Sequence, residues 1–165
     1  MLRIAILAAG VLAAVVLLIV AVGYTLPVAH VATREAQLAA PLERVYSALR
    51  DVEKFPGWRS DVKSVELLAT TPAVRWRERG DNDITFEMES VDAPRRMVTR
   101  IVDRSLPFGG SWTYELSPQQ GGTRLVITEH GEVYNPPFRF VSRFVMGHTA
   151  TIDKYIEDLQ RHLGQ

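Results

Sequence analysis

The N-terminal part of the chain is an uninterrupted apolar run of 19 residues, Ile4 to Val22, made only of Ile, Leu, Val, Ala and one Gly. It contains no polar position that would mark a solvent-exposed helix face. A helix of this length rises about 30 Å, which matches the hydrocarbon thickness of a bilayer. The run therefore predicts a membrane-spanning anchor over residues 1–25, followed by a linker over residues 26–30.

The flanks of this run bear on its processing and its orientation. Ala21-Val22-Gly23 resembles a cleavage site, so a cleaved signal peptide is the alternative, although such peptides usually have only about 7–15 apolar residues. Arg3 is the only charged side chain ahead of the run. By the positive-inside rule, a single-pass anchor would keep the N-terminus in the cytoplasm and place the rest of the chain on the outer side, periplasmic or extracytoplasmic.

Beyond residue 30 the pattern changes to short stretches in which apolar and polar positions alternate, as is typical of half-buried β-strands. Turn signals such as Thr71-Pro72, Gly80-Asp81-Asn82 and Gly121-Gly122 separate them. The expected strands are residues 31–39, 62–68, 73–79, 83–91, 95–102, 111–116 and 123–133.

Apolar positions at three- and four-residue spacing indicate two helical regions. A short helix follows Pro41 and ends near Arg50. The C-terminal region predicts one long helix that starts at the N-cap Asn135 and ends at Gly164. This order of elements predicts an α+β fold, an antiparallel sheet of six to seven strands wrapped around the long C-terminal helix. The stripe of that helix expected to face the sheet is Val141, Val145, His148, Ile152, Ile156, Leu159 and Leu163.

The alternation also assigns faces to the strands. Pairing the third expected strand with the fourth places Trp76 opposite Phe86, and Met88 shares their apolar face. Trp112 and Tyr114 extend this face from another strand. These residues are ordinary core residues on the simplest interpretation, but a curved sheet covered by one helix also leaves room for an apolar ligand.

Composition narrows the possible functions. The chain has 165 residues, which is one ordinary domain. Its 19 Lys and Arg balance 19 Asp and Glu, so no basic excess favours nucleic-acid binding. The absence of cysteine excludes disulfides, thiolate metal sites and a cysteine nucleophile. The hydrophobic content of 47% is too high for a disordered chain.

Candidate chemical groups are few. The four histidines lack metal-ligand spacing, and no nucleotide-binding or serine-hydrolase motif occurs, so we expect neither a metal nor a cofactor. His148 is expected to face the sheet, as a core histidine bonded to a backbone group or, less simply, as a catalytic residue. Glu78 shares strand parity with Trp76, so it is expected to point inward as a polar anchor at a cavity mouth, or to reach solvent beyond the sheet edge. Glu129 and His130 lie on opposite faces of a strand and cannot form an adjacent dyad.

Five stretches of the chain carry a resemblance to a known family. They are residues 40–51 (APLERVYSALRD), 55–58 (FPGW), 106–112 (LPFGGSW), 122–125 (GTRL) and 128–133 (TEHGEV). Together they resemble the START-like, helix-grip (SRPBCC) superfamily and, within it, the polyketide cyclase/dehydrase and lipid-transport group. The resemblance covers roughly residues 31–163. It implies a seven-stranded sheet wrapped around the C-terminal helix with an apolar cavity between them, and it does not determine the function.

Two functional hypotheses of different classes follow, with residues 31–165 as the folded domain. The first is a membrane-tethered binding module that holds or carries a hydrophobic, lipid-like small molecule. The second is a cyclase- or dehydratase-type enzyme acting on a polyketide-like or other apolar substrate, in which Glu78 or His148 moves protons. A fully packed interaction domain is a third option, and the oligomeric state stays open.

We adopt the binding module and assign no catalytic residue. Its expected partners are the ligand and the membrane, with no nucleic acid. A gate is expected in the loop of residues 105–110, where Leu106 and Phe108 lie near a Gly109-Gly110 hinge. The expected ligand-binding residues are Trp76, Glu78, Phe86, Met88, Trp112, Tyr114, Val145, His148 and Ile152.

Overall fold

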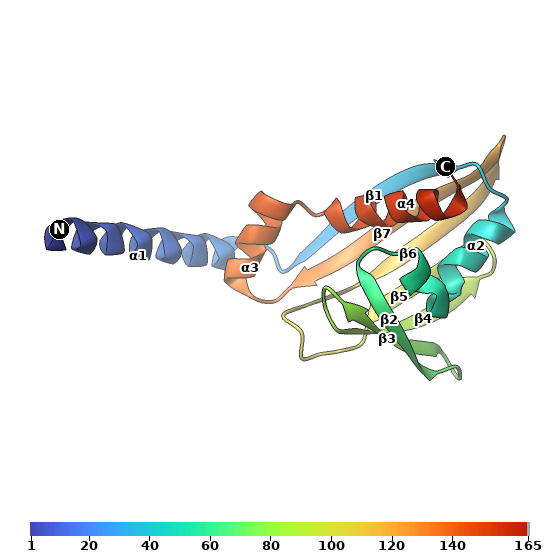
Figure 1. The fold of residues 1–165 in the computed structure, drawn as a ribbon, viewed down its shortest axis with the longest axis horizontal. Coiled ribbons are helices and arrows are strands. Elements are labelled where there is room, and N and C mark those ends of the chain that lie inside the picture. The colour runs from blue at the N-terminus through green and yellow to red at the C-terminus, as the bar shows by residue number, and fades with distance from the viewer. Residues whose placement is uncertain (165) are drawn as a thin grey trace.

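The structure of the protein, a computed structural model, describes residues 1–164, apart from the side chains of residues 90 and 91 (Figure 1). Its main feature is a seven-stranded antiparallel sheet in the order β1-β7-β6-β5-β4-β3-β2, which confirms the expected sheet. Consecutive strands from β2 to β7 are neighbours, and β1 pairs with β7. The strands are β1 (Ala29–Leu38), β2 (Val62–Ala69), β3 (Val74–Gly80), β4 (Ile84–Asp92), β5 (Arg96–Ile101), β6 (Phe108–Gln119) and β7 (Gly122–Val133).

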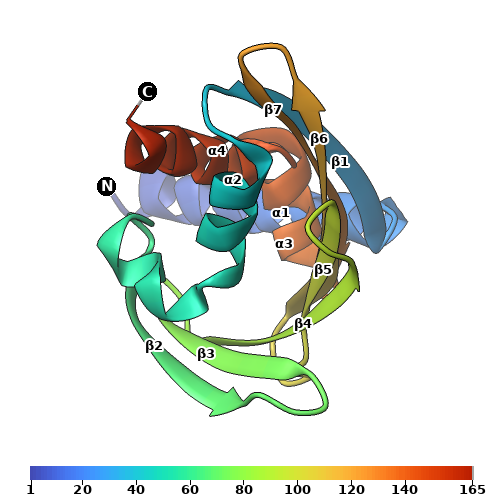
Figure 2. The same cartoon turned by 90° about the vertical axis from the view of Figure 1, so that its right-hand side faces the viewer.

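The sheet curls around α2 (Leu42–Arg50), the short 3-10 helix η1 (Val52–Gly57) and α4 (Ala150–Leu163), as Figure 2 shows. Both α-helices are amphipathic, and their apolar residues, such as Val45 and Leu159, are fully buried. We call the face of the sheet that carries these helices the inner face. Because strand side chains alternate, the core lies between the inner face and the helices. The α+β helix-grip fold is thereby confirmed.

The expected hairpin register is also confirmed, since Trp76 lies opposite Phe86 in the β3–β4 pair. On the opposite, outer face, Glu87 Oε2 lies 2.6 Å from Arg75 Nη2, and Arg100 pairs with the other oxygen of the same carboxylate. The arginines and glutamates of this face therefore pair with one another across neighbouring strands.

The expectation of a single C-terminal helix is wrong, because the region is divided into three pieces. α3 (Pro136–Val141) begins as expected, with the side chain of Asn135 accepting a hydrogen bond from the Phe138 backbone N–H at 3.1 Å. A π-helical turn, η2 (Ser142–Met146), follows it. Gly147 then adopts φ = 76°, a conformation that favours glycine and ends the helix, and α4 starts three residues later. The apolar spacing continues across the break and so could not reveal it.

α1 (Leu2–Thr25) extends away from the sheet as one helix (Figure 1). Its length and apolar character suit either a membrane span or a signal sequence. Its C-terminal end contacts α3 so closely that a Cβ on Gly23 would lie 2.0 Å from the carbonyl oxygen of Pro136. Arg139 Nη1 also donates to the carbonyl oxygens of Gly23 and Leu26 at 3.2 and 2.9 Å, which satisfies groups that the helix end leaves unpaired. We call this contact the α1–α3 joint.

Candidate functional site

The predicted ligand-lining side chains of the sheet and α4 form two groups on the inner face. Those at most 7% exposed pack into the core: Trp76, Glu78, Met88, Tyr114 and Ile152. Phe86 and Trp112 are only partly buried against this core. The Phe86 ring lies 5.5 Å from that of Trp76 and 6.1 Å from that of Trp112, measured between centroids. The three rings form a continuous aromatic row that crosses the inner face from the buried Trp76 to the partly buried Trp112.

α4 begins only at Ala150, so it covers part of the length of the inner face. The helix begins level with Arg34 of β1, whose Nη2 donates to Thr149 Oγ1 at 2.8 Å. The strands continue past this level toward α1 (Figure 1), and the positive φ of Gly147 separates η2 from α4. The broken C-terminal region thus leaves the end of the aromatic row uncovered by α4.

Four side chains meet at this end, and we call them the polar-aromatic cluster: His30, Trp112, Glu129 and His148. The imidazoles of His30 and His148 stack with centroids 3.9 Å apart. His30 Nε2 lies 3.4 Å from Glu129 Oε1, and Trp112 Nε1 donates to Glu129 Oε2 at 3.1 Å. His148 Nδ1 lies 3.5 Å from Ser142 Oγ of η2. The cluster therefore connects β1, β6 and β7 to the segment before α4.

Burial determines the charge preferences of the cluster. It raises the pKa of the Glu129 carboxyl, although the hydrogen bond from Trp112 and the nearby His148 oppose the shift. Burial also lowers the pKa of His30, and the positive charge of Arg143 lowers it further. The pKa of His148 is lowered by burial, His30 and Arg143, against the opposing effect of Glu129. The cluster thus favours neutral imidazoles beside a carboxyl that protonates more readily than an exposed glutamate.

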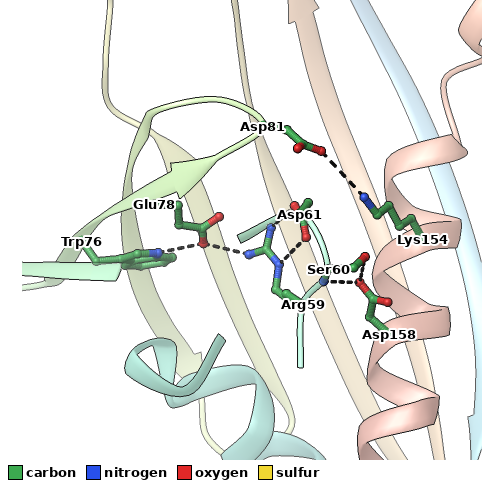
Figure 3. A network of polar contacts seen from close by, with 8 residues as sticks. All are labelled: Arg59, Ser60, Asp61, Trp76, Glu78, Asp81, Lys154 and Asp158. Atoms are coloured by element: carbon green, nitrogen blue, oxygen red, sulfur yellow. Dashed lines mark hydrogen bonds and ion pairs between the residues drawn. The ribbon is translucent and has the colours of Figure 1, made fainter. Parts of the chain in front are cut away.

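A second polar network lies deeper, beside Trp76 (Figure 3). Arg59 Nη1 donates to Glu78 Oε1 at 2.8 Å, and Arg59 Nη2 donates to Asp61 Oδ2 at 2.6 Å. The same Glu78 oxygen accepts a hydrogen bond from Trp76 Nε1 at 2.9 Å. Glu78 points inward as its parity predicts, but it is only 5% exposed. The alternative that it reaches solvent beyond the sheet edge is therefore excluded.

This network joins the segment before β2 to α4. Ser60 donates through its backbone N–H and its hydroxyl to Asp158 Oδ2, at 2.8 and 2.7 Å. The Arg59 guanidinium lies 5.2 Å from the centre of the Tyr155 ring, also on α4. Lys154 Nζ on α4 also lies 3.8 Å from Oδ2 of Asp81, which follows β3 (Figure 3). The network thereby holds α4 and the Trp76 indole in fixed positions.

Within this network, Arg59 and its carboxylate partners each stabilise the charged form of the other. Burial raises the pKa of the Glu78 carboxyl, while Arg59 and the Trp76 N–H oppose the shift by stabilising the carboxylate. Burial would lower the pKa of Arg59, but Glu78 and Asp61 keep it above its ordinary value, so the guanidinium remains charged. The arrangement is that of a buried ion pair with its hydrogen bonds satisfied, which suits a structural role.

Val145 lies outside the inner face. It is 72% exposed on η2, because the π-helical turn and Gly147 rotate it away from the sheet, so the expectation that it faces the sheet is wrong. Its predicted ligand contact gains no support from this position. His148, three residues later, does lie toward the sheet, where it stacks on a β1 side chain.

The predicted gate loop is shorter than expected. Gly109 and Gly110 pair with β7 inside β6, so they do not form a loop hinge. Gly110 has φ = 140°, and a Cβ there would lie 2.4 Å from the His130 carbonyl oxygen. Glycine is therefore needed at this position so that β6 can pair closely with β7, not to provide a hinge. Leu106 and Phe108 are half-buried, and the Phe108 ring lies 6.5 Å from that of Phe138 on α3. Their role as a gate stays a prediction.

A separate hollow of about 600 Å³ lies on the outer face, and the sequence did not predict it. Ser111 and His130 line it, and they alternate with Trp112 and Glu129 of the cluster, so the two sites lie on opposite sides of the sheet. Its other side chains are mainly charged or polar, including Arg100, Asp103, Arg104, Glu132 and Tyr134. An apolar ligand is better matched to the aromatic row than to this hollow.

Sequence reasoning missed several residues of the two networks, and His30, Glu129 and Arg59 show why. His30 was assigned to the linker, but β1 begins at Ala29, and extending the strand alternation backward would have found it. Glu129 has the same strand parity as the buried Ile127, which indicates that it points inward. Arg59 has a local partner in Asp61, but its buried partner Glu78 is 19 residues away, and nothing near Arg59 in the sequence indicates that pair. Among residues 1–164, no group of three or more His, Cys, Asp and Glu side chains is arranged to hold a metal ion.

Solved structures share this fold. A START superfamily protein from Mycobacterium smegmatis is 17% identical, with a TM-score of 0.64 over 81% of this chain and 97% of that one. The protein TTHA0849 from Thermus thermophilus is 23% identical, with a TM-score of 0.67 over 82% and 96%. The di-domain ARO/CYC BexL from the BE-7585A biosynthetic pathway is 16% identical, with a TM-score of 0.65, and the match covers 86% of this chain and 52% of BexL.

At these identities the structural matches show the fold alone. A search of curated proteins found no match. The family model described as polyketide cyclase / dehydrase and lipid transport matches residues 29–164, which span the whole sheet together with α2, α3 and α4. Because this match covers most of the sequence, the chain belongs to the polyketide cyclase/dehydrase and lipid transport family.

Proposed function

We propose that this protein is a membrane-anchored binding module that holds or carries a hydrophobic, lipid-like small molecule between the inner face and the C-terminal helical region. The observation that carries the proposal is the aromatic row, which ends in the partly buried rings of Phe86 and Trp112 where α4 does not cover the sheet. An apolar ligand lying there would remove aromatic surface from water, at about 25 cal/mol per Å².

The polar-aromatic cluster supports a ligand with one polar end. His30 and His148 present imidazoles whose lowered pKa favours the neutral form, which can donate or accept hydrogen bonds, and the carboxyl oxygens of Glu129 can accept them. These groups lie at the end of an otherwise apolar row, as in ligand sites where a few polar groups orient an apolar molecule. An apolar body with a single hydroxyl, carbonyl or carboxyl group fits this arrangement.

The α1–α3 joint supports a retained anchor rather than a cleaved signal peptide. Cleavage near Ala21-Val22-Gly23 would remove a helix whose terminal carbonyls Arg139 caps and whose glycine fits against Pro136. With α1 in the membrane, the single Arg3 at its start favours a cytoplasmic N-terminus and a folded domain on the outer side. The anchor would keep the binding site at the bilayer surface, where lipid-like ligands partition.

The proposal is tested with a dansyl-labelled fatty acid as probe and the full chain in detergent micelles. Saturable binding beyond that of protein-free micelles is expected. Phe86→Ala and Trp112→Ala should each weaken it about tenfold, or 1.4 kcal/mol. Leu68→Ala, at an exposed leucine of β2, is the control and should bind like the parent chain. Equal affinities for all four proteins would contradict the proposed site.

The polar-aromatic cluster favours one alternative, a cyclase- or dehydratase-type enzyme. Glu129, with its raised pKa, lies 3.4 Å from His30 Nε2 and could exchange a proton with a substrate placed beside it. Glu129→Gln separates the two functions. It should abolish turnover of an apolar substrate if the protein is an enzyme, whereas a binding module should retain its ligand.

A further inference from the structure

Exposed apolar side chains gather on α3 and η2. Among the described side chains of residues 26–164, Val145 is the most exposed large apolar one at 72%, and its neighbours Phe144 and Met146 are exposed to 60% and 58%. Phe138 on α3 is also exposed. Runs of three exposed apolar residues are unusual on a surface that faces only water. We call these four residues the apolar rim.

The α1–α3 joint determines where the apolar rim lies if α1 spans the membrane, as proposed above. The 24 residues of α1 rise about 36 Å, which is about 6 Å more than the hydrocarbon core. Its last turn, which contains Gly23, therefore lies in the interfacial layer. Gly23 is in direct contact with Pro136 at the start of α3, and Arg139 binds the carbonyls of the same turn. Figure 1 shows α3 lying across the end of α1 rather than along its axis.

The chemistry of the apolar rim fits this layer. Phenylalanine, valine and methionine side chains are suited to the boundary between headgroups and acyl chains, and Arg143 beside them can remain among the headgroups. Tyr24 is exposed at the end of α1 and is a residue type enriched at membrane interfaces. A second copy of the chain could also cover apolar residues, but the contact of α3 with the last turn of a spanning helix favours lipid as the occupant.

We propose that the apolar rim inserts into the interfacial layer of the leaflet in which α1 ends, so that α3 and η2 form a second membrane contact beside the anchor. This proposal rests on the proposed membrane anchor. It also places the polar-aromatic cluster near the lipid surface, because His148 lies two residues after the end of η2 and contacts Ser142 within it.

Spin-label accessibility in the full chain tests this proposal. The chain has no cysteine, so single labels can be attached at Phe144→Cys and Val145→Cys without removing native thiols. Leu12→Cys on α1 reports whether the anchor spans the bilayer, and Leu68→Cys on β2 is a matched control in the folded domain. The labelled chains are reconstituted in phosphatidylcholine vesicles. Oxygen, which concentrates in lipid, and a water-soluble nickel chelate serve as paramagnetic probes.

The labels at positions 144 and 145 should be several-fold more accessible to oxygen than to the nickel chelate, as at position 12 and unlike position 68. Labels at 144 and 145 that face water while position 12 lies in lipid would overturn the apolar-rim proposal and leave the anchor standing. Rim labels shielded from both probes would show that protein covers them and would also overturn it. A label at position 12 in water would refute the anchor and this proposal with it.

Discussion

Replacing Glu78 by leucine is expected to destabilise the domain strongly, because it removes the shared acceptor of the buried network. The same carboxylate oxygen accepts hydrogen bonds from Arg59 Nη1 at 2.8 Å and from Trp76 Nε1 at 2.9 Å. Breaking a buried ion pair costs about 3–5 kcal/mol, and an indole N–H left without an acceptor costs about 1–3 kcal/mol. Because the two effects share one group and Asp61 still binds Arg59, we expect a loss of about 4 kcal/mol.

The comparison with glutamine isolates the hydrogen bonds from the charge. The amide oxygen in Glu78→Gln can accept both hydrogen bonds, so this variant should lose only about 1–2 kcal/mol. Glu66→Gln is the control, since Glu66 is half-exposed in its ion pair with Arg79 at 3.3 Å and should change stability by less than about 0.5 kcal/mol.

Thermal unfolding of the full chain in detergent, followed by tryptophan fluorescence at one scan rate, provides the measurement. At about 3 °C per kcal/mol for a domain of this size, Glu78→Leu should lower the midpoint by about 12 °C and Glu78→Gln by about 5 °C. If Glu78→Leu is no less stable than Glu78→Gln, the network does not depend on Glu78 as its acceptor and the reasoning is refuted.

Two further predictions concern the α1–α3 joint and the polar-aromatic cluster. Gly23→Val should force α1 and α3 apart and raise the rate of amide hydrogen exchange across α3. Gly10→Val is the control, because a Cβ there meets no atom within 4 Å, and it should leave the exchange rate unchanged. Equal exchange rates in the two variants would argue against the joint. In NMR titrations the pKa of His148 should fall further in Glu129→Gln and rise in Arg143→Gln, and shifts of the same sign would contradict the cluster geometry. Burial holds the pKa of His148 in the folded state below its unfolded value near 6.5. The free energy of unfolding should therefore be highest above that pH and should decrease as the pH falls toward the folded pKa, because the unfolded state then binds the proton more readily.

Most of the fold could be predicted because it is encoded in short-range patterns. Strand alternation placed Trp76 opposite Phe86, and the turn signals separated the strands correctly. The break at Gly147 was missed because apolar spacing continues on both sides of it, and a backbone conformation leaves no mark in that spacing. Val145 was misplaced for the same reason.

The candidate site was less predictable, since its polar contacts join residues far apart in sequence. His30 and His148 stack only because β1 and the segment before α4 meet in three dimensions. Arg59 finds Glu78 across the β2–β3 pair in the same way. Residue type and parity can indicate that a side chain points inward, as for Glu78, but they do not name its partner.

The break after η2 links the two proposals. A continuous C-terminal helix would carry Val145 over the sheet and cover the end of the aromatic row. The break instead exposes Phe144, Val145 and Met146 on one side and leaves Trp112 partly uncovered on the other. The same short segment therefore accounts for the exposed apolar rim and for the partly buried ring at the end of the aromatic row.

The central claim is that the protein holds a hydrophobic small molecule, and native mass spectrometry with lipid extraction tests it most directly. The full chain is purified from the membranes of its own source cell in mild detergent and analysed intact. We expect an apolar molecule bound at near-unit stoichiometry, and its loss in Trp112→Ala. A chain that is empty as purified, and still empty after incubation with a lipid extract of the same membranes, would contradict the claim.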